Sequence, residues 1–253
     1  MLGYGTRLAS RRLKHATATG SGQGLPNSAT ALESLRTSDA VIAVYDPSDP
    51  EYVFSNLGGT ASVSAPSDPV GMLKNAKGNG VLDLAARATA RRPVWNGGAL
   101  SFDGTDDALD GVFSAGAGPA AAALLAIYKG ADSQGILFSR TTGSTGYVGA
   151  IEQGDGGAVA NMVGSPTIEV EGVAVSNRAE LFTHLCNGQA NLMVATDCNL
   201  SGWSGIHVSA YTSWGLSGLV LPIAVIDQGH ADHGQMTMKA TEHASDLIAK
   251  LTL

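Results

Sequence analysis

Four aspartates lie close together in the segment DGTDDALD, at positions 103, 106, 107 and 110. Calcium prefers several carboxylate and carbonyl oxygens in a flexible loop, so Asp103, Asp106 and Asp107 are candidate ligands. The spacing is not that of an EF-hand loop. Aspartate and glycine also suit a strand-ending turn, because Asx side chains accept hydrogen bonds from nearby backbone groups. We favour the turn, keep calcium as the alternative, and predict no other cofactor.

His230, Asp232 and His233, in the segment GHADHG, form a second cluster of potential ligands. Imidazole and carboxylate suit zinc and other divalent ions. No cysteine or distant residue clearly completes the set. We favour an exposed polar loop between the last strand and a C-terminal helix.

Glu169 and Glu171 stand two residues apart in the alternating segment TIEVE, which predicts a half-buried strand with both carboxylates on one face. A retaining glycosidase needs two carboxyl groups roughly 5 to 5.5 Å apart. The segment lacks the longer acidic motif of glycosidases built on β-sandwiches, so a solvent-facing row is favoured. The segment GSGQG at 20–24 lacks the strand and the Lys-Ser/Thr of a phosphate loop, and no G-x-S-x-G elbow occurs. We therefore predict that the chain is not an enzyme.

Trp203, Tyr211 and Trp214 concentrate aromatic rings within twelve residues. Flat rings stack on sugars and fill binding hot spots, so these three are the candidate carbohydrate surface. Packing in the core or in a loop is the simpler interpretation, because aromatic residues are few in this chain.

The composition limits the class of protein. Glycine is frequent, at 33 of 253 residues, and charged residues make up only 15%, a profile that suits short strands and tight turns. No apolar stretch approaches the length of a membrane-spanning helix, and the N-terminus lacks the apolar core of a secretory signal. Cys186 and Cys198 are too few for a disulfide framework. They are either buried thiols or a single pair across a hairpin.

Charge divides the chain into two parts. Residues 1–36 hold one acid, Glu33, and the five basic residues Arg7, Arg11, Arg12, Lys14 and Arg36. The remaining chain is net negative. This asymmetry indicates an arm suited to an acidic surface or a phosphate backbone, with a solvated leader as the alternative.

A linker follows the basic residues of the arm, and helices and strands follow the linker. The small, polar stretch 17–28 is typical of a linker, and 29–36 has the spacing of a capping box for a short helix. Ala244, Leu247, Ile248 and Leu251 form the apolar stripe of a C-terminal helix. We place an arm and linker at 1–38 and one all-β antiparallel sandwich at 39–253. The expected strands are the apolar runs at 41–45, 99–102, 122–128, 135–139, 146–151, 167–175, 181–186, 190–195, 205–211 and 219–226.

Two segments carry a resemblance to a known family. They are VYDPSDPEYVFSNLGGTASVSAPSDPVGMLKNAKGNG at 44–80 and RPVWNGGALSFDGTDDAL at 92–109. Together they resemble the opening of concanavalin A-like, laminin G-like domains of phage, prophage and gene-transfer-agent-like virion proteins. The segment ELFTHLCNGQANLMVAT at 180–196 looks like the paired central strands of such domains. The resemblance implies a jelly-roll β-sandwich over residues 40–253.

The resemblance also implies a function. Such domains decorate a phage head or tail and are held by a short N-terminal segment. We therefore expect a virion protein, assembled in the bacterial cytoplasm, whose arm binds a capsid or tail protein through Arg7, Arg11, Arg12 and Lys14. A homo-oligomer or symmetric array is expected, with host polysaccharide as a further partner. No membrane and no specific nucleic acid are expected. A free lectin is the alternative, and a glycoside hydrolase comes third.

Overall fold

The computed structural model describes residues 28–251, apart from 131–133, 141–145 and 210–213. The four basic residues of the predicted arm, together with Tyr211, lie outside the described residues.

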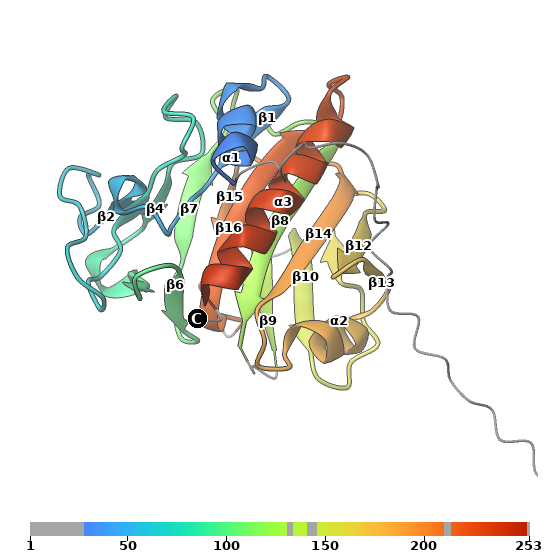
Figure 1. Ribbon diagram of the computed structural model, residues 1–253. Coiled ribbons are helices and arrows are strands. Elements are labelled where there is room, and N and C mark those ends of the chain that lie inside the picture. The colour runs from blue at the N-terminus through green and yellow to red at the C-terminus, as the bar shows by residue number, and fades with distance from the viewer. Residues whose placement is uncertain (1–27, 131–133, 141–145, 210–213, 252–253) are drawn as a thin grey trace, which may run out of the picture.

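Two antiparallel sheets of eight strands form the molecule (Figure 1), which confirms the prediction of an all-β sandwich. The first sheet, called sheet A here, has the order β13-β12-β14-β8-β16-β6-β5, with β1 also paired to β16. Its strands are β1 Val41–Val44, β5 Val94–Trp95, β6 Leu100–Asp103, β8 Ala122–Lys129, β12 Thr167–Val170, β13 Val173–Val175, β14 Asn191–Cys198 and β16 Ser217–Asp227.

The second sheet, sheet B, has the order β11-β10-β9-β15-β7-β4-β3-β2. Its strands are β2 Val53–Phe54, β3 Met72–Leu73, β4 Leu84–Ala86, β7 Leu109–Val112, β9 Gln134–Arg140, β10 Tyr147–Glu152, β11 Ala160–Asn161 and β15 Gly205–Val208. Two 3-10 turns are present: Pro50–Tyr52 lies between β1 and β2, and Thr89–Arg91 lies between β4 and β5.

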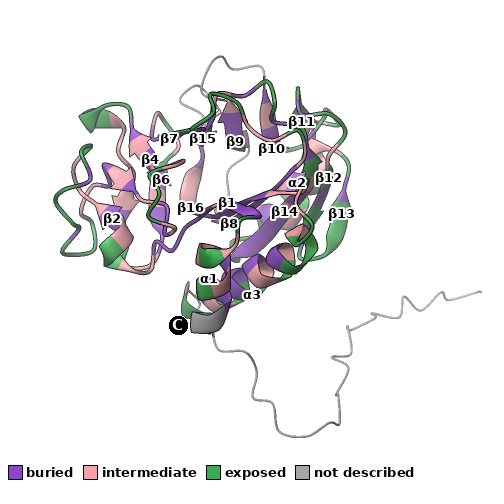
Figure 2. Ribbon diagram, turned by 90° about the horizontal axis from the view of Figure 1, so that it is seen from above, coloured by how far each residue is buried: buried purple, intermediate pink, exposed green. Residues whose placement is uncertain are grey.

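The central strand β8 is buried on both faces, and this explains its continuous apolar sequence. Leu124, Ala126 and Tyr128 point into the core between the sheets. Leu125 and Ile127 point the other way, into a second core beneath the helices. Figure 2 shows β8 in the colour of buried residues, with strands of sheet B on one side and helices on the other. A strand that faces water on neither side has no reason to alternate polar and apolar residues.

Two helices close the outer face of sheet A. Helix α3, His233–Leu251, crosses the strands β16, β8 and β14 (Figure 1), and its Ala244 and Leu247 are buried, as the apolar stripe predicted. Helix α1, Ser28–Thr37, confirms the predicted short helix and packs beside α3. Because Leu35 is fully buried in this second core, α1 belongs to the folded body, although the sequence-based boundary after residue 38 had grouped it with the arm.

One predicted strand is wrong. The run 181–186, taken as part of a pair of central strands, lies in helix α2, Arg178–Leu185. The side chain of Asn177 accepts a hydrogen bond from the Glu180 N–H at 2.9 Å, and the Glu180 carboxylate accepts one from the Ser176 N–H at 2.8 Å. The first bond satisfies an amide group that the helix start leaves without a partner, and the second ties the residue before the cap to the first turn. The Asn-x-x-Glu spacing was the available signal.

Candidate functional site

The structure brings the predicted calcium ligands together. Carboxylate oxygens of Asp103, Asp106 and Asp107 lie within 4.8 Å of one another at the turn between β6 and β7. Turn chemistry already uses much of their capacity. The Asp103 carboxylate accepts the Thr105 N–H at 2.8 Å, and that of Asp107 accepts the Asp103 N–H at 3.0 Å. The favoured turn interpretation is therefore confirmed, and calcium binding stays a prediction.

Electrostatic repulsion is concentrated on Asp107. Burial first, then the neighbouring carboxylates of Asp103 and Asp106, raise the pKa of Asp107 from 3.8 to about 6. Asp106 also lies 3.3 Å from the Arg91 guanidinium. A cation bound at this turn would offset the repulsion between the carboxylates. This is the chemical argument for a metal at the turn.

The fourth aspartate of the string, Asp110, serves elsewhere. It stands on β7 opposite His207 of β15, and the His207 Nδ1 contacts its Oδ1. Its other oxygen pairs with the Arg87 Nε, and the Arg87 Nη2 lies 2.9 Å from the His207 Nε2. A guanidinium only donates, so the His207 Nε2 accepts from Arg87.

Ser139 completes a Ser, His and Asp series across three adjacent strands, because it is the β9 partner of His207. Their neighbours Ile206, Val208 and Leu109 face the core, so the three polar residues are on the outer face of sheet B. In a catalytic triad the Nε2 atom faces the nucleophile. Here Arg87 occupies that atom, which favours a structural ion cluster over a general base.

The sequence held no local signal for this cluster. Asp110 and His207 are almost a hundred residues apart, and only the antiparallel pairing of β7 with β15 makes them neighbours. A search for short motifs cannot find residues that only sheet register brings together.

The structure places the aromatic candidates Trp203 and Trp214 in different environments. Trp203 is only 1% exposed and packs in the core, with its indole N–H directed at the Met162 carbonyl at 3.4 Å. It is therefore not a sugar-stacking residue, and this part of the predicted surface is wrong. Burying this large apolar side chain in the core is more favourable than leaving it exposed to water. Trp214 is half-buried and packs with Tyr147, Ile136 and Ala150.

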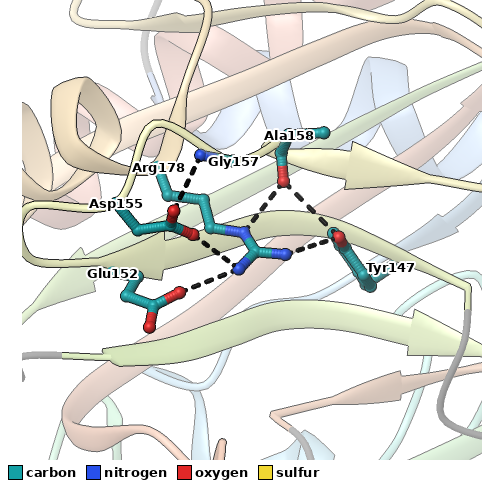
Figure 3. A network of polar contacts seen from close by, with 6 residues as sticks. All are labelled: Tyr147, Glu152, Asp155, Gly157, Ala158 and Arg178. Carbon is teal, nitrogen blue, oxygen red and sulfur yellow. Dashed lines mark hydrogen bonds and ion pairs between the residues drawn. The ribbon is translucent and has the colours of Figure 1, made fainter.

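Beside Trp214 stands an arginine network that the sequence did not predict (Figure 3). The Arg178 Nη1 donates to both Glu152 and Asp155 at 2.8 Å, and its Nη2 donates to the Tyr147 hydroxyl at 2.8 Å. Its Nε donates to the Ala158 carbonyl. The guanidinium also lies 5.0 Å from the Trp214 ring. The network joins the start of α2 to β10 and to the loop after it.

The second predicted ligand cluster forms the polar loop that we favoured. The His230 Nδ1 is 3.8 Å from the Asp232 carboxylate, and the ring of His233 is within 2.8 Å of the His230 carbonyl through Nδ1. Both contacts are internal to the turn before α3.

Glu169 and Glu171 line a groove of about 320 Å³ between α3 and the strands β12 and β14. They are exposed, which agrees with a solvent-facing row. They do not continue one strand, because Glu171 has a positive φ of 50° at the β12–β13 turn. Its Oε1 accepts the Leu192 N–H at 2.7 Å, so this carboxylate joins the turn to β14.

Cys186 and Cys198 do not form a disulfide. Cys198 is fully buried at the end of β14, and burial, reinforced by Asp197, raises the pKa of its thiol to about 12. Cys186 ends α2 and is partly exposed. The prediction of two buried thiols is therefore confirmed for Cys198 and wrong for Cys186, which is only partly buried.

Comparisons of the chain with family models, with curated proteins and with solved structures find no match. Among the described residues, no helix is both long and apolar enough to span a bilayer.

Proposed function

We propose that this chain is a non-enzymatic structural protein of a virion, assembled in the bacterial cytoplasm. It serves as a head decoration or spike, or as a tail-fibre or baseplate component. The arm, with Arg7, Arg11, Arg12 and Lys14, holds it to a capsid or tail protein, and the concanavalin A-like sandwich is displayed outward.

The observation that carries this proposal is the division of charge between arm and sandwich. Residues 1–27, which precede α1, have four basic residues and no acid, whereas residues 28–253 have 11 basic and 22 acidic residues. Among the described residues, the sandwich and its helices form two buried cores. A separate basic segment attached to an acidic domain suits binding to a carboxylate-rich surface.

Removal of the arm tests the proposal. Because α1 packs on α3, the truncation should start at residue 25, so that the folded body stays intact. A milder variant changes Arg7, Arg11, Arg12 and Lys14 to Gln. We expect both to reduce incorporation into particles by roughly tenfold or more. The matched control, Lys239→Gln with Lys250→Gln, should incorporate normally. Normal occupancy of the arm variants would refute the anchor.

Copy number per particle then separates the two locations. Hundreds of copies indicate a symmetric array of head decorations, whereas a handful indicate a vertex spike or a tail appendage. Particle mass spectrometry makes this measurement.

A carbohydrate-binding module is the second candidate. Trp214 and Tyr147 favour it, because these two aromatic rings lie beside the charged groups of Arg178 on α2 and Glu152 on β10. Saccharides are commonly bound by such mixed surfaces. Silence of the folded protein on a glycan array would exclude the glycans tested. A glycoside hydrolase, the third candidate, requires turnover that Glu169→Gln with Glu171→Gln abolishes.

A further inference from the structure

The groove beside α3 has an unusual supply of hydrogen-bond acceptors. On its helical wall, Thr237, Thr241 and Ser245 recur every four residues. Each hydroxyl donates its proton to the backbone carbonyl four residues earlier, at 2.9, 3.0 and 2.9 Å. A hydroxyl has one proton and two lone pairs, so these side chains face the groove as acceptors.

The opposite wall adds negative charge. Glu169 is exposed, and within the described part of the chain its carboxylate has no hydrogen-bond or ion-pair partner. Glu171 uses one oxygen on the Leu192 N–H and keeps the other. None of the described residues that line the groove is basic. A ligand that fits must therefore bring donors and positive charge.

The floor of the groove is apolar, formed by Leu192, Val194 and Ile248. Arginine and lysine combine an aliphatic stem with a charged donor head. The stem suits such a floor, and the head suits the acceptors along the walls. A basic peptide segment satisfies both features, whereas an anionic ligand satisfies neither.

We propose that this groove binds the chain's own N-terminal arm, through the basic segment Arg7 to Lys14. The charges are complementary, and the first part of the segment, Arg7 to Arg11, matches the helical wall in length. Thr237 to Ser245 spans about 12 Å of helix, and Arg7 to Arg11 spans about 13 Å when extended. The proposal rests on the arm's proposed role as an anchor. In the free subunit the groove binds the basic segment, and during assembly the particle binds the same segment instead.

The arm is long enough for this contact. Helix α1 begins at Ser28 and packs on α3, the helix that forms one wall of the groove. The 13 residues between Lys14 and Ser28 reach at most about 45 Å. A helix is only about 10–12 Å across. Docking within one molecule is also favoured by the high effective concentration of a tethered segment.

Limited trypsin digestion of the purified full-length protein tests the contact. Trypsin cleaves after Arg11 and Arg12, and a docked arm is cleaved slowly. We expect Glu169→Gln to speed this cleavage roughly three- to tenfold, and salt raised from about 0.05 to about 0.5 M to do the same in the parent protein. The matched control is Glu51→Gln, which removes an exposed carboxylate that does not line the groove. Equal cleavage rates for the two variants would overturn the proposal.

Carbodiimide cross-linking supplies the second readout. It joins the Lys14 amine to the Glu169 carboxylate only if the two meet, and mass spectrometry identifies the product. We expect this cross-link in a species of monomer size, lost in Glu169→Gln. A dimer-sized product would overturn docking within one chain. Because both assays use free protein, their failure is distinguishable from failure of particle anchoring, which only incorporation measures.

Discussion

Asp107 makes the stability of the acidic turn depend on pH. Its pKa is about 6 in the folded chain, against an ordinary 3.8. The folded state therefore binds a proton more tightly, so this group stabilises below pH 4 and loses its contribution as pH rises through about 6. We predict that Asp107→Asn raises the melting temperature at pH 7 to 8 by a few degrees and changes it little at pH 4. Calorimetry at both pH values measures the difference.

The comparison must be made between variants, because Asp68 and Glu180 have lowered pKa values that act in the opposite sense. Asp232→Asn, an exposed change, serves as the control. Calcium enters the same experiment. If the ion binds, millimolar calcium raises the melting temperature of the parent chain and not of Asp107→Asn. No response in either protein would remove calcium from consideration.

At the scale of elements, the attachment of α2 to sheet B depends on Arg178. Its side chain is 18% exposed and holds Glu152 and Asp155 at once. We predict that Arg178→Ala lowers the free energy of unfolding by about 2 kcal/mol, since two carboxylates lose their shared partner. Arg178→Lys should recover less than half, because an ammonium cannot reproduce the planar fork. Urea titration measures both.

A surface ion pair supplies the comparison. Lys239→Ala breaks a contact with Glu242 one turn along α3, and such exposed pairs contribute at most about 0.5 kcal/mol. If Arg178→Ala cost no more than Lys239→Ala, the network would not hold α2 to the sheet.

For the whole molecule, Cys198 reports global unfolding. It is fully buried where β14 ends, and its thiol pKa is about 12. We predict that iodoacetamide at pH 8 labels Cys186 in the native protein and Cys198 only on global unfolding. Labelling followed by mass spectrometry across a urea series gives the midpoint. In the Cys186→Ser variant, Cys198 is the thiol that remains to be labelled. Labelling of Cys198 at urea concentrations well below the unfolding midpoint would contradict unfolding as a single cooperative unit.

The amino-acid sequence by itself determined the class of fold and the sign of the charges. Short apolar runs between glycine and aspartate turns predicted most strands, and the i, i+3, i+4, i+7 stripe predicted α3, because these patterns are local. The acidic turn and the polar loop before α3 were also local. The helix α2 was missed because its stretch is so short that the apolar residues match the periodicity of a helix and of a strand. Only the capping residue Asn177 distinguishes the two.

Tertiary structure alone decided which side chains meet. His207 and Asp110 share a site through strand register, Arg178 reaches β10 from the start of α2, and the groove needs α3 laid against β12 and β14. Trp203 was directed into the core for the same reason. Contacts between residues distant in the chain depend on how sheets and helices stack, and no short sequence pattern encodes that stacking.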